Sequence, residues 1–257
     1  MRRGLVGVGL ALTAALVGFT GLVAVNAMAG QTAGESHTYT FNGSALSVDV
    51  ALGDVRIVPG KAGEIIVARQ LTYGLRRPFV EEGIDGDTFR VRDQTCTADT
   101  FFPCHVHWIL QVPRDLSVEV RTVAGSITVS GMADTVKLTS VSGAVTAIGP
   151  SGKLVSLRSH DGLVTAQNVS SPQVVATSDN QAVSLTFRSP PALVVGRSQT
   201  GRVGVILPDG DEAYKITAEA GPNGGRTVAA KTDDNAKRAI NIRSSKGDVS
   251  VFQSSDN

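Results

Sequence analysis

The residues best suited to chemistry in this chain are two histidines that follow a cysteine. In Cys104-His105-Val106-His107, the side chains of His105 and His107 would project from the same face of a strand, where two imidazoles can contact one transition metal. The opposite face of that strand would be apolar, with Val106, Trp108, Leu110 and Val112. We therefore expect surface histidines on the wetter face, and His105 and His107 remain only weak candidates for a metal site.

The only two cysteines, Cys96 and Cys104, enclose a short polar and aromatic segment, Thr97 to Pro103. In an oxidising compartment an isolated pair this close is typical of a loop-closing disulfide. Such a bond would also remove the thiolate that a metal beside His105 would need. Two free thiols or a redox pair are the alternatives.

A serine, a histidine and an aspartate stand together at Ser159-His160-Asp161. These are the residue types of a hydrolase triad, but a triad is assembled from separated segments, and neighbours on an extended chain cannot all face one reacting atom. A G-x-S-x-G elbow does not occur in the sequence. We interpret this segment as a turn, and predict no catalytic residue and no cofactor.

An internal repeat must position these residues. Around Gly125, apolar residues stand seven and five positions before and two and four after, with a Thr three positions before. The same offsets recur around Gly143, Gly162, Gln181, Gly201 and Gly247, where Ser replaces Thr and Gln181 replaces the glycine. These origins lie 18, 19, 19, 20 and 46 residues apart, so the last interval has room for an irregular copy near Gly224 and Gly225. An early copy surrounds Gly53, with Val50 in place of the hydroxyl.

Each copy predicts two alternating strands joined by a T/S-x-x-G corner, with its apolar residues on one face. Stacked copies would bury that face in continuous columns, and the corner glycines would accept positive φ. The prediction is an all-β fold, a β-solenoid or β-helix-like stack of 18–20-residue two-strand repeats. An antiparallel β-sandwich or meander with hairpins at the same spacing is the alternative.

The regular repeats occupy 113–257 and leave an irregular region over 59–112. Strand-like runs occur there at Glu64–Gln70, Asp87–Arg92 and His105–Val112, separated by turn signals. We expect a hairpin-rich cap, because an open end of a stack presents unpaired strand edges.

The N-terminus has the parts of an export signal: Arg2 and Arg3, an apolar stretch from Gly4 to Val25, and the small-x-small pattern Ala27-Met28-Ala29. Residues 1–29 are thus a signal peptide or, if uncleaved, an N-terminal membrane anchor. The polar segment 30–44 is expected to be a flexible tether, followed by one domain over 45–257.

Short motifs run through this domain: G-D-V-R-I at Gly53–Ile57, G-D-T-F-R-V at Gly86–Val91, the cysteine pair, and V-P-R-D-L at Val112–Leu116 leading into the repeats. The chain resembles, over Leu46 to Phe252, the bacterial putative-adhesin domain family of exported proteins. The resemblance implies a stacked β fold at the cell envelope, sometimes associated with envelope-stress systems. The family has no active-site residues to carry over, and Gln181 and Gly196 depart from the repeat.

The charge balance is nearly neutral. The formal net charge is +1, and removing Arg2 and Arg3 with the leader leaves 22 basic against 23 acidic residues (24 − 2 = 22). We therefore predict no nucleic-acid partner, and contact with a membrane only through the N-terminal segment. The predicted function is a non-enzymatic envelope or surface module that binds a protein or a glycan. A carbohydrate-active β-helix enzyme and a membrane-tethered envelope-stress sensory partner are the alternatives.

Overall fold

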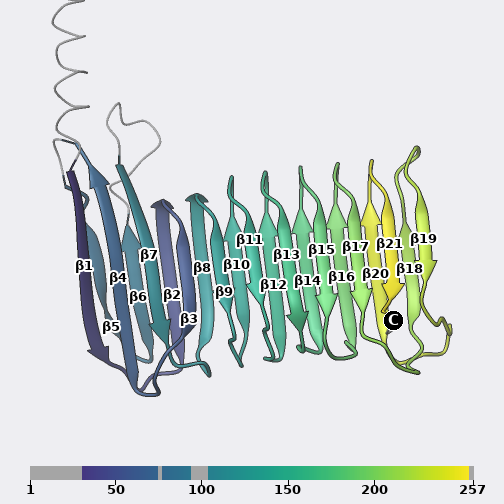
Figure 1. The fold of residues 1–257 in the computed structure, drawn as a ribbon, viewed down its shortest axis with the longest axis horizontal. Coiled ribbons are helices and arrows are strands. Elements are labelled where there is room, and N and C mark those ends of the chain that lie inside the picture. The colour runs from purple at the N-terminus through teal and green to yellow at the C-terminus, as the bar shows by residue number, and fades with distance from the viewer. Residues whose placement is uncertain (1–30, 75–76, 94–103, 255–257) are drawn as a thin grey trace, which may run out of the picture.

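The computed structural model describes residues 31–74, 77–93 and 104–254, and in these ranges the chain forms 21 strands in two layers of one elongated stack (Figure 1). Within the described ranges no helix is long and apolar enough to cross a membrane. The leader at 1–29 lies outside them.

Two sheets make up the layers. The eleven strands of sheet A are, in spatial order, β1 (Gln31–Thr40), β4 (Glu64–Tyr73), β7 (Cys104–Val112), β3 (Val55–Pro59), β9 (Ile127–Ser130), β11 (Val145–Ile148), β13 (Val164–Val169), β15 (Val183–Phe187), β17 (Val203–Leu207), β21 (Val249–Gln253) and β19 (Arg226–Ala229). The ten strands of sheet B are β18 (Lys215–Glu219), β20 (Ala239–Ser244), β16 (Leu193–Ser198), β14 (Gln173–Ser178), β12 (Leu154–Ser159), β10 (Val136–Ser140), β8 (Ser117–Ala124), β2 (Ala45–Leu52), β6 (Thr88–Asp93) and β5 (Val80–Asp85).

Successive repeats pair in parallel and in the register that the sequence predicts. Val136 on β10 stands opposite Val118 on β8 and Val155 on β12. Each copy therefore forms one coil, with its first strand in sheet B and its second in sheet A. The β-solenoid prediction is confirmed, and the parallel pairing is incompatible with the antiparallel sandwich or meander.

At both ends of the stack, the order of the coils in space differs from their order in sequence. The last copy, β20 and β21, lies directly on β16 and β17, with Val194 opposite Ile240 and Ser198 opposite Ser244. The irregular copy near Gly224, β18 and β19, lies outside it (Figure 1). Likewise β2 and β3 lie directly on β8 and β9, while β6 and β7 form one more coil beyond them.

The N-terminal cap completes this arrangement with antiparallel strands. Strand β4 pairs antiparallel with both β1 and β7, and β5 forms an antiparallel hairpin with β6. Hairpin pairing in the irregular region thus coexists with parallel pairing, because β6 and β7 also join the stack through β2 and β3.

The expectation of a flexible tether over 30–44 is wrong for residues 31–40, which form β1. All ten residues of β1 pair with β4, from Gln31 opposite Tyr73 to Thr40 opposite Glu64. Its residues are exposed or half-buried, so the strand lacks the apolar alternation by which half-buried strands are recognised. Backbone pairing, polar contacts and the Tyr39 ring, whose centroid lies 4.9 Å from that of Phe89, hold it in place.

The core is a set of aliphatic columns between the sheets. Val118, Val136, Val155, Val174 and Val194 form one column and are all buried. Larger and smaller side chains alternate between the two strands of a coil: Leu138 with Ala147, Leu157 with Ala166, and the reverse in Ala176 with Leu185. This complementarity keeps the volume per coil similar, as close packing requires.

Buried serine hydroxyls connect each coil to the next. Ser159 Oγ accepts a hydrogen bond from the Gly162 backbone N–H of its own corner at 2.8 Å and donates one to the Gly143 carbonyl of the preceding coil at 2.8 Å. The hydroxyls of Ser140, Ser178, Ser198 and Ser244 make the same two bonds, at 2.7–3.2 Å. The serine of the repeat thus bonds each coil to the preceding one, whereas the buried Thr122 hydroxyl of the first regular copy has no hydrogen-bond partner in the described structure.

Close approach of neighbouring corners is the main reason for glycine there. A Cβ at Gly143 would lie 1.8 Å from the Gly125 carbonyl oxygen, and one at Gly162 would lie 1.9 Å from that of Gly143. The expectation of positive φ holds at Gly53 (137°) and Gly125 (146°) only; Gly143, Gly162, Gly201 and Gly247 lie outside that region. The short distance between stacked corners, more than the conformation of the turn, therefore requires glycine at these positions.

Charged side chains cover the N-terminal end of the core. Arg69 on β4 forms ion pairs with Glu82 on β5 and, at 2.6 Å, with Glu35 on β1, and its guanidinium lies 6.0 Å from the Trp108 ring centroid. Tyr39 donates a hydrogen bond to Glu82 at 2.8 Å; burial, together with that bond, raises the pKa of Tyr39 to about 12. These contacts bind β1 and β5 to the stack.

We predict that Ser159→Ala lowers the free energy of unfolding by about 1–3 kcal/mol, because it leaves a buried N–H and a buried carbonyl without a partner. Urea titration measures the change. The matched control is Ser156→Ala on the outward face of the same strand, expected to change stability by less than about 0.5 kcal/mol. Equal losses in the two variants would contradict the role of the hydroxyl.

We predict that Arg69→Met costs about 3 kcal/mol of stability, because the Glu82 side chain, only 4% exposed, would keep its charge without its partner. The double variant Arg69→Met/Glu82→Gln should recover part of this loss. Arg90→Met, which breaks the exposed pair with Asp85, serves as control and should cost less than about 1 kcal/mol. A loss in Arg69→Met no larger than in the control would refute the proposed strength of the cap.

Candidate functional site

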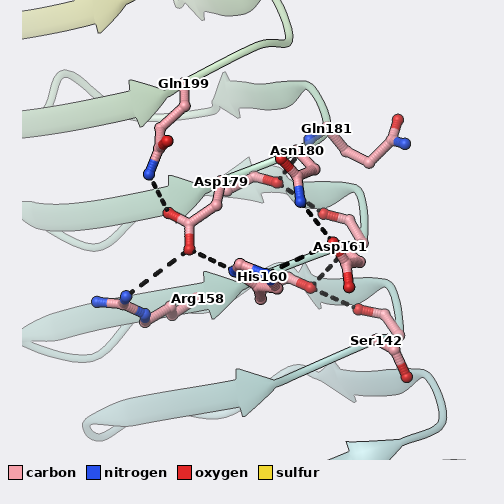
Figure 2. A network of polar contacts seen from close by, with 12 residues as sticks. Ser142, Arg158, His160, Asp161, Asp179, Asn180, Gln181 and Gln199 are labelled. Atoms are coloured by element: carbon pink, nitrogen blue, oxygen red, sulfur yellow. Dashed lines mark hydrogen bonds and ion pairs between the residues drawn. The ribbon is translucent and has the colours of Figure 1, made fainter.

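The corners at the middle of the stack carry a polar network that links three coils (Figure 2). His160 Nδ1 lies 2.7 Å from Asp179 Oδ2 of the next coil, and Asn180 donates to Asp161 Oδ1 at 2.6 Å. Gln199, one coil further, donates to Asp179 Oδ1 at 3.3 Å. Residues at equivalent corner positions therefore interact from coil to coil.

This network shifts the ionisation of its central pair. The hydrogen bond to Asp179 raises the pKa of His160 above 6.5, and the same bond lowers the pKa of Asp179 below 3.8. Because the folded state favours the protonated His160 imidazole, this bond stabilises the fold fully below pH 6.5, and the stabilisation is lost as the pH rises through the raised pKa of His160. The Asp179 contribution is complete above pH 3.8 and is lost as pH falls through the lowered pKa.

The structure separates the three residues that resemble a triad. The hydroxyl of Ser159 is buried inside the corner, where it bonds only backbone groups. His160 and Asp161 instead lie on the outside, as Figure 2 shows. Ser159 thus takes part in the scaffold, as its interpretation as a corner residue implies.

His105 and His107 both lie exposed on the outward face of β7. The nearest acidic partner is Asp54, whose Oδ2 lies 3.4 Å from His107 Nδ1. Over the described ranges, no group of three histidine, cysteine or acidic side chains gathers to hold a metal. Cys96 lies outside these ranges, so its disulfide with Cys104 stays a prediction.

A row of arginines follows the outward face of sheet B and was not singled out from the sequence. The position just before each buried hydroxyl points outward, and the paired strands align these positions as Arg121, Thr139, Arg158, Thr177, Arg197 and Arg243. The signal was present in the repeats as R-[TS]-x-x-G, in four copies. The row lies at positions between the inward and corner residues, so the offsets that define the repeat do not include it.

A shallow depression lies over one end of this arginine row. It has a volume of about 380 Å³ and is lined by Arg197, Arg243, Thr217, Asn241 and Glu219 from β16, β20 and β18. Guanidinium, hydroxyl and amide groups therefore surround one open site, together with the Glu219 carboxylate, which lies 3.4 Å from Arg243. This combination suits a ligand that presents both negative charge and hydroxyl groups.

We predict that Asp179→Asn lowers the pKa of His160 towards 6.5, leaving only the smaller rise caused by Asp161. NMR titration of the His160 imidazole resonances measures the change in pKa. The control is Asp209→Asn at a distant turn, which should leave the His160 titration as it is. An unchanged pKa in Asp179→Asn would contradict the bond between the two coils.

Comparison with solved structures finds bacterial proteins to which this chain is similar. A "putative lipid binding protein" from Parabacteroides distasonis shares 11% identity at a TM-score of 0.50, over 88% of this chain and 98% of that one. A "putative adhesin" from Bacteroides fragilis shares 13% identity at a TM-score of 0.49, over 86% and 97%. At these identities the likeness concerns the fold alone.

No curated protein matches the chain. The family model described as Toastrack DUF4097 matches residues 43–257, which cover all described strands of the stack except β1. The match agrees with the resemblance that the repeat motifs indicate. The chain belongs to the Toastrack DUF4097 family.

Proposed function

We propose that this chain is a non-enzymatic interaction module outside the cytoplasmic membrane, and that it binds its ligand on the outward face of sheet B. The observation that carries the proposal is the arginine row, because exposed cations repeated along a rigid sheet can bind a long partner at several points at once. The proposal takes residues 1–29 as the export signal or anchor and Cys96–Cys104 as a disulfide.

The inward and outward positions of each coil differ in what they contact, and this difference supports a binding role. Inward positions are aliphatic, and the serine hydroxyls and corner glycines bond or contact neighbouring coils. Outward positions are free to vary without disturbing the core, and the recurrence of arginine there calls for a reason other than folding. The names of the structural neighbours, which include adhesin, agree with a binding role for this fold.

The test uses the full chain expressed in bacteria with a C-terminal epitope. We expect it in the extracytoplasmic fraction and expect saturable co-sedimentation with isolated envelope material without release of reducing ends. A variant that lacks residues 1–29 should stay in the cytoplasm and serves as control. Alkylation of the exported chain with and without reductant reports whether Cys96 and Cys104 are paired.

Three results would overturn the proposal. Retention of the full chain in the cytoplasm would refute export, and absence of binding to envelope material would refute the interaction role. Release of reducing ends by the purified chain would show an enzyme instead.

A further inference from the structure

We propose that the arginine row binds a linear polysaccharide whose carboxylates recur on every second sugar. This inference rests on the proposed function and narrows it to one class of ligand.

The spacing of the row is the first argument. Neighbouring strands lie about 4.8 Å apart, so residues two strands apart are separated by about 10 Å. Arg121, Arg158 and Arg197 stand at such intervals, with Thr139 and Thr177 between them. This distance is comparable to one disaccharide of an extended glycan, so each guanidinium can meet one carboxylate while each threonine hydroxyl meets the sugar between.

The charge of the face is the second argument. Strands β8, β10, β12, β14, β16 and β20 carry five basic side chains, Arg121, Lys137, Arg158, Arg197 and Arg243, and one acidic side chain, Glu119. The local net charge is thus +4 (5 − 1), whereas the formal charge of the whole sequence is +1. Acidic residues end the row on both sides, with Asp49 opposite Arg121 and Glu219 opposite Arg243.

The guanidinium groups are accessible to a ligand. The side chains of Arg121, Arg158 and Arg243 are 64–66% exposed, and their ion pairs with Glu119, Asp179 and Glu219 span 2.5 to 3.9 Å. The pairs of Arg121 and Arg243 are exposed on both sides and therefore weak, so a ligand carboxylate can replace them. The pair of Arg158 is long, at 3.9 Å, although its Asp179 side chain is only 15% exposed. Arg197 is exposed and, within the described parts of the chain, forms no ion pair.

The depression at Arg197 and Arg243 gives the row a place to hold one sugar. The two guanidiniums occupy paired positions on adjacent strands, and the Thr217 hydroxyl and Asn241 amide lie beside them. The Glu219 carboxylate also lines the depression, in the exposed pair with Arg243 that a ligand carboxylate would replace. Guanidinium binds carboxylate with two parallel hydrogen bonds, while hydroxyl and amide groups match sugar hydroxyls.

The same face fits nucleic acid poorly. Phosphates of a nucleic-acid strand follow one another more closely than Arg121, Arg158 and Arg197 do. Binding of single strands also relies on aromatic side chains that stack on the bases, and the six strands contain no aromatic residue. A carboxylated glycan needs neither close phosphates nor stacking.

The test compares two triple variants of the exported full chain, each with three positive charges removed. Arg121→Gln/Arg158→Gln/Arg197→Gln removes the row, and Lys153→Gln/Arg188→Gln/Lys246→Gln removes exposed cations from turns and corners. Thermal unfolding monitored by circular dichroism establishes that both are folded. The probes are hyaluronan, whose carboxylate recurs on every second sugar, neutral dextran, and poly(dT).

We expect the unaltered chain and the turn variant to bind hyaluronan alike, and the row variant to bind it about tenfold or more weakly. Raising the salt concentration should weaken the unaltered chain more than the row variant. Equal binding by the two variants, or binding to dextran as strong as to hyaluronan, would overturn the proposal. Stronger binding to poly(dT) would assign the row to phosphate polymers and overturn it too.

This inference and the proposed function fail separately. If the row variant binds isolated envelope material as well as the unaltered chain does, the interaction role stands and the arginine row is not its site. If neither binds envelope material, the proposed function itself fails.

Discussion

One contact repeated along the stack underlies the rest of the structure: the buried serine hydroxyl that bonds its own corner and the carbonyl of the coil before it. This contact joins corners that lie so close that a Cβ at Gly143 would lie 1.8 Å from the Gly125 oxygen. It also fixes register, since a slip of one residue would turn every inward side chain of a strand to solvent. The aliphatic columns, the corner glycines and the outward rows all depend on that register.

A repeating contact also creates a problem at the ends, where another strand could add to the stack. The chain places less regular strands outside the regular coils at both ends. Strands β18 and β19 lie outside β20 and β21, and β6 and β7 lie outside β2 and β3, with β5 beyond β6 and with β4 and β1 beyond β7. At the N-terminal end, Arg69, Glu35 and Glu82 then replace aliphatic side chains at inward positions. Charge there favours contact among the cap strands over stacking of a further apolar coil.

Because folding uses the inward positions and the corners, the outward faces can change without loss of the fold. The corner network of His160 and Asp179 and the row of arginines both arise in this way, from residues that ladder pairing places next to their counterparts one or two coils away. When the same outward residue recurs once per coil in the sequence, the stack therefore aligns its side chains in one row. Such lines match polymeric ligands, which also repeat.

The sequence by itself determined the coil: its length, its two strands, its inward columns, its hydroxyl and its corner. These properties are local or strictly periodic, so the offsets around Gly125 and Gly162 were enough to align Val118, Val136 and Val155. The arginine row could also have been found there, as R-[TS]-x-x-G. Only the tertiary structure decided the ends. Strand β1 carries no apolar period from which it could be recognised. Pairing with β4 and ion pairs through Glu35 hold it in place, and both are tertiary contacts. The sequence of one repeat does not state which strand it will lie against. The places of β18 and β6 towards the ends of sheet B depend on which strand edges of the assembled stack are still unpaired.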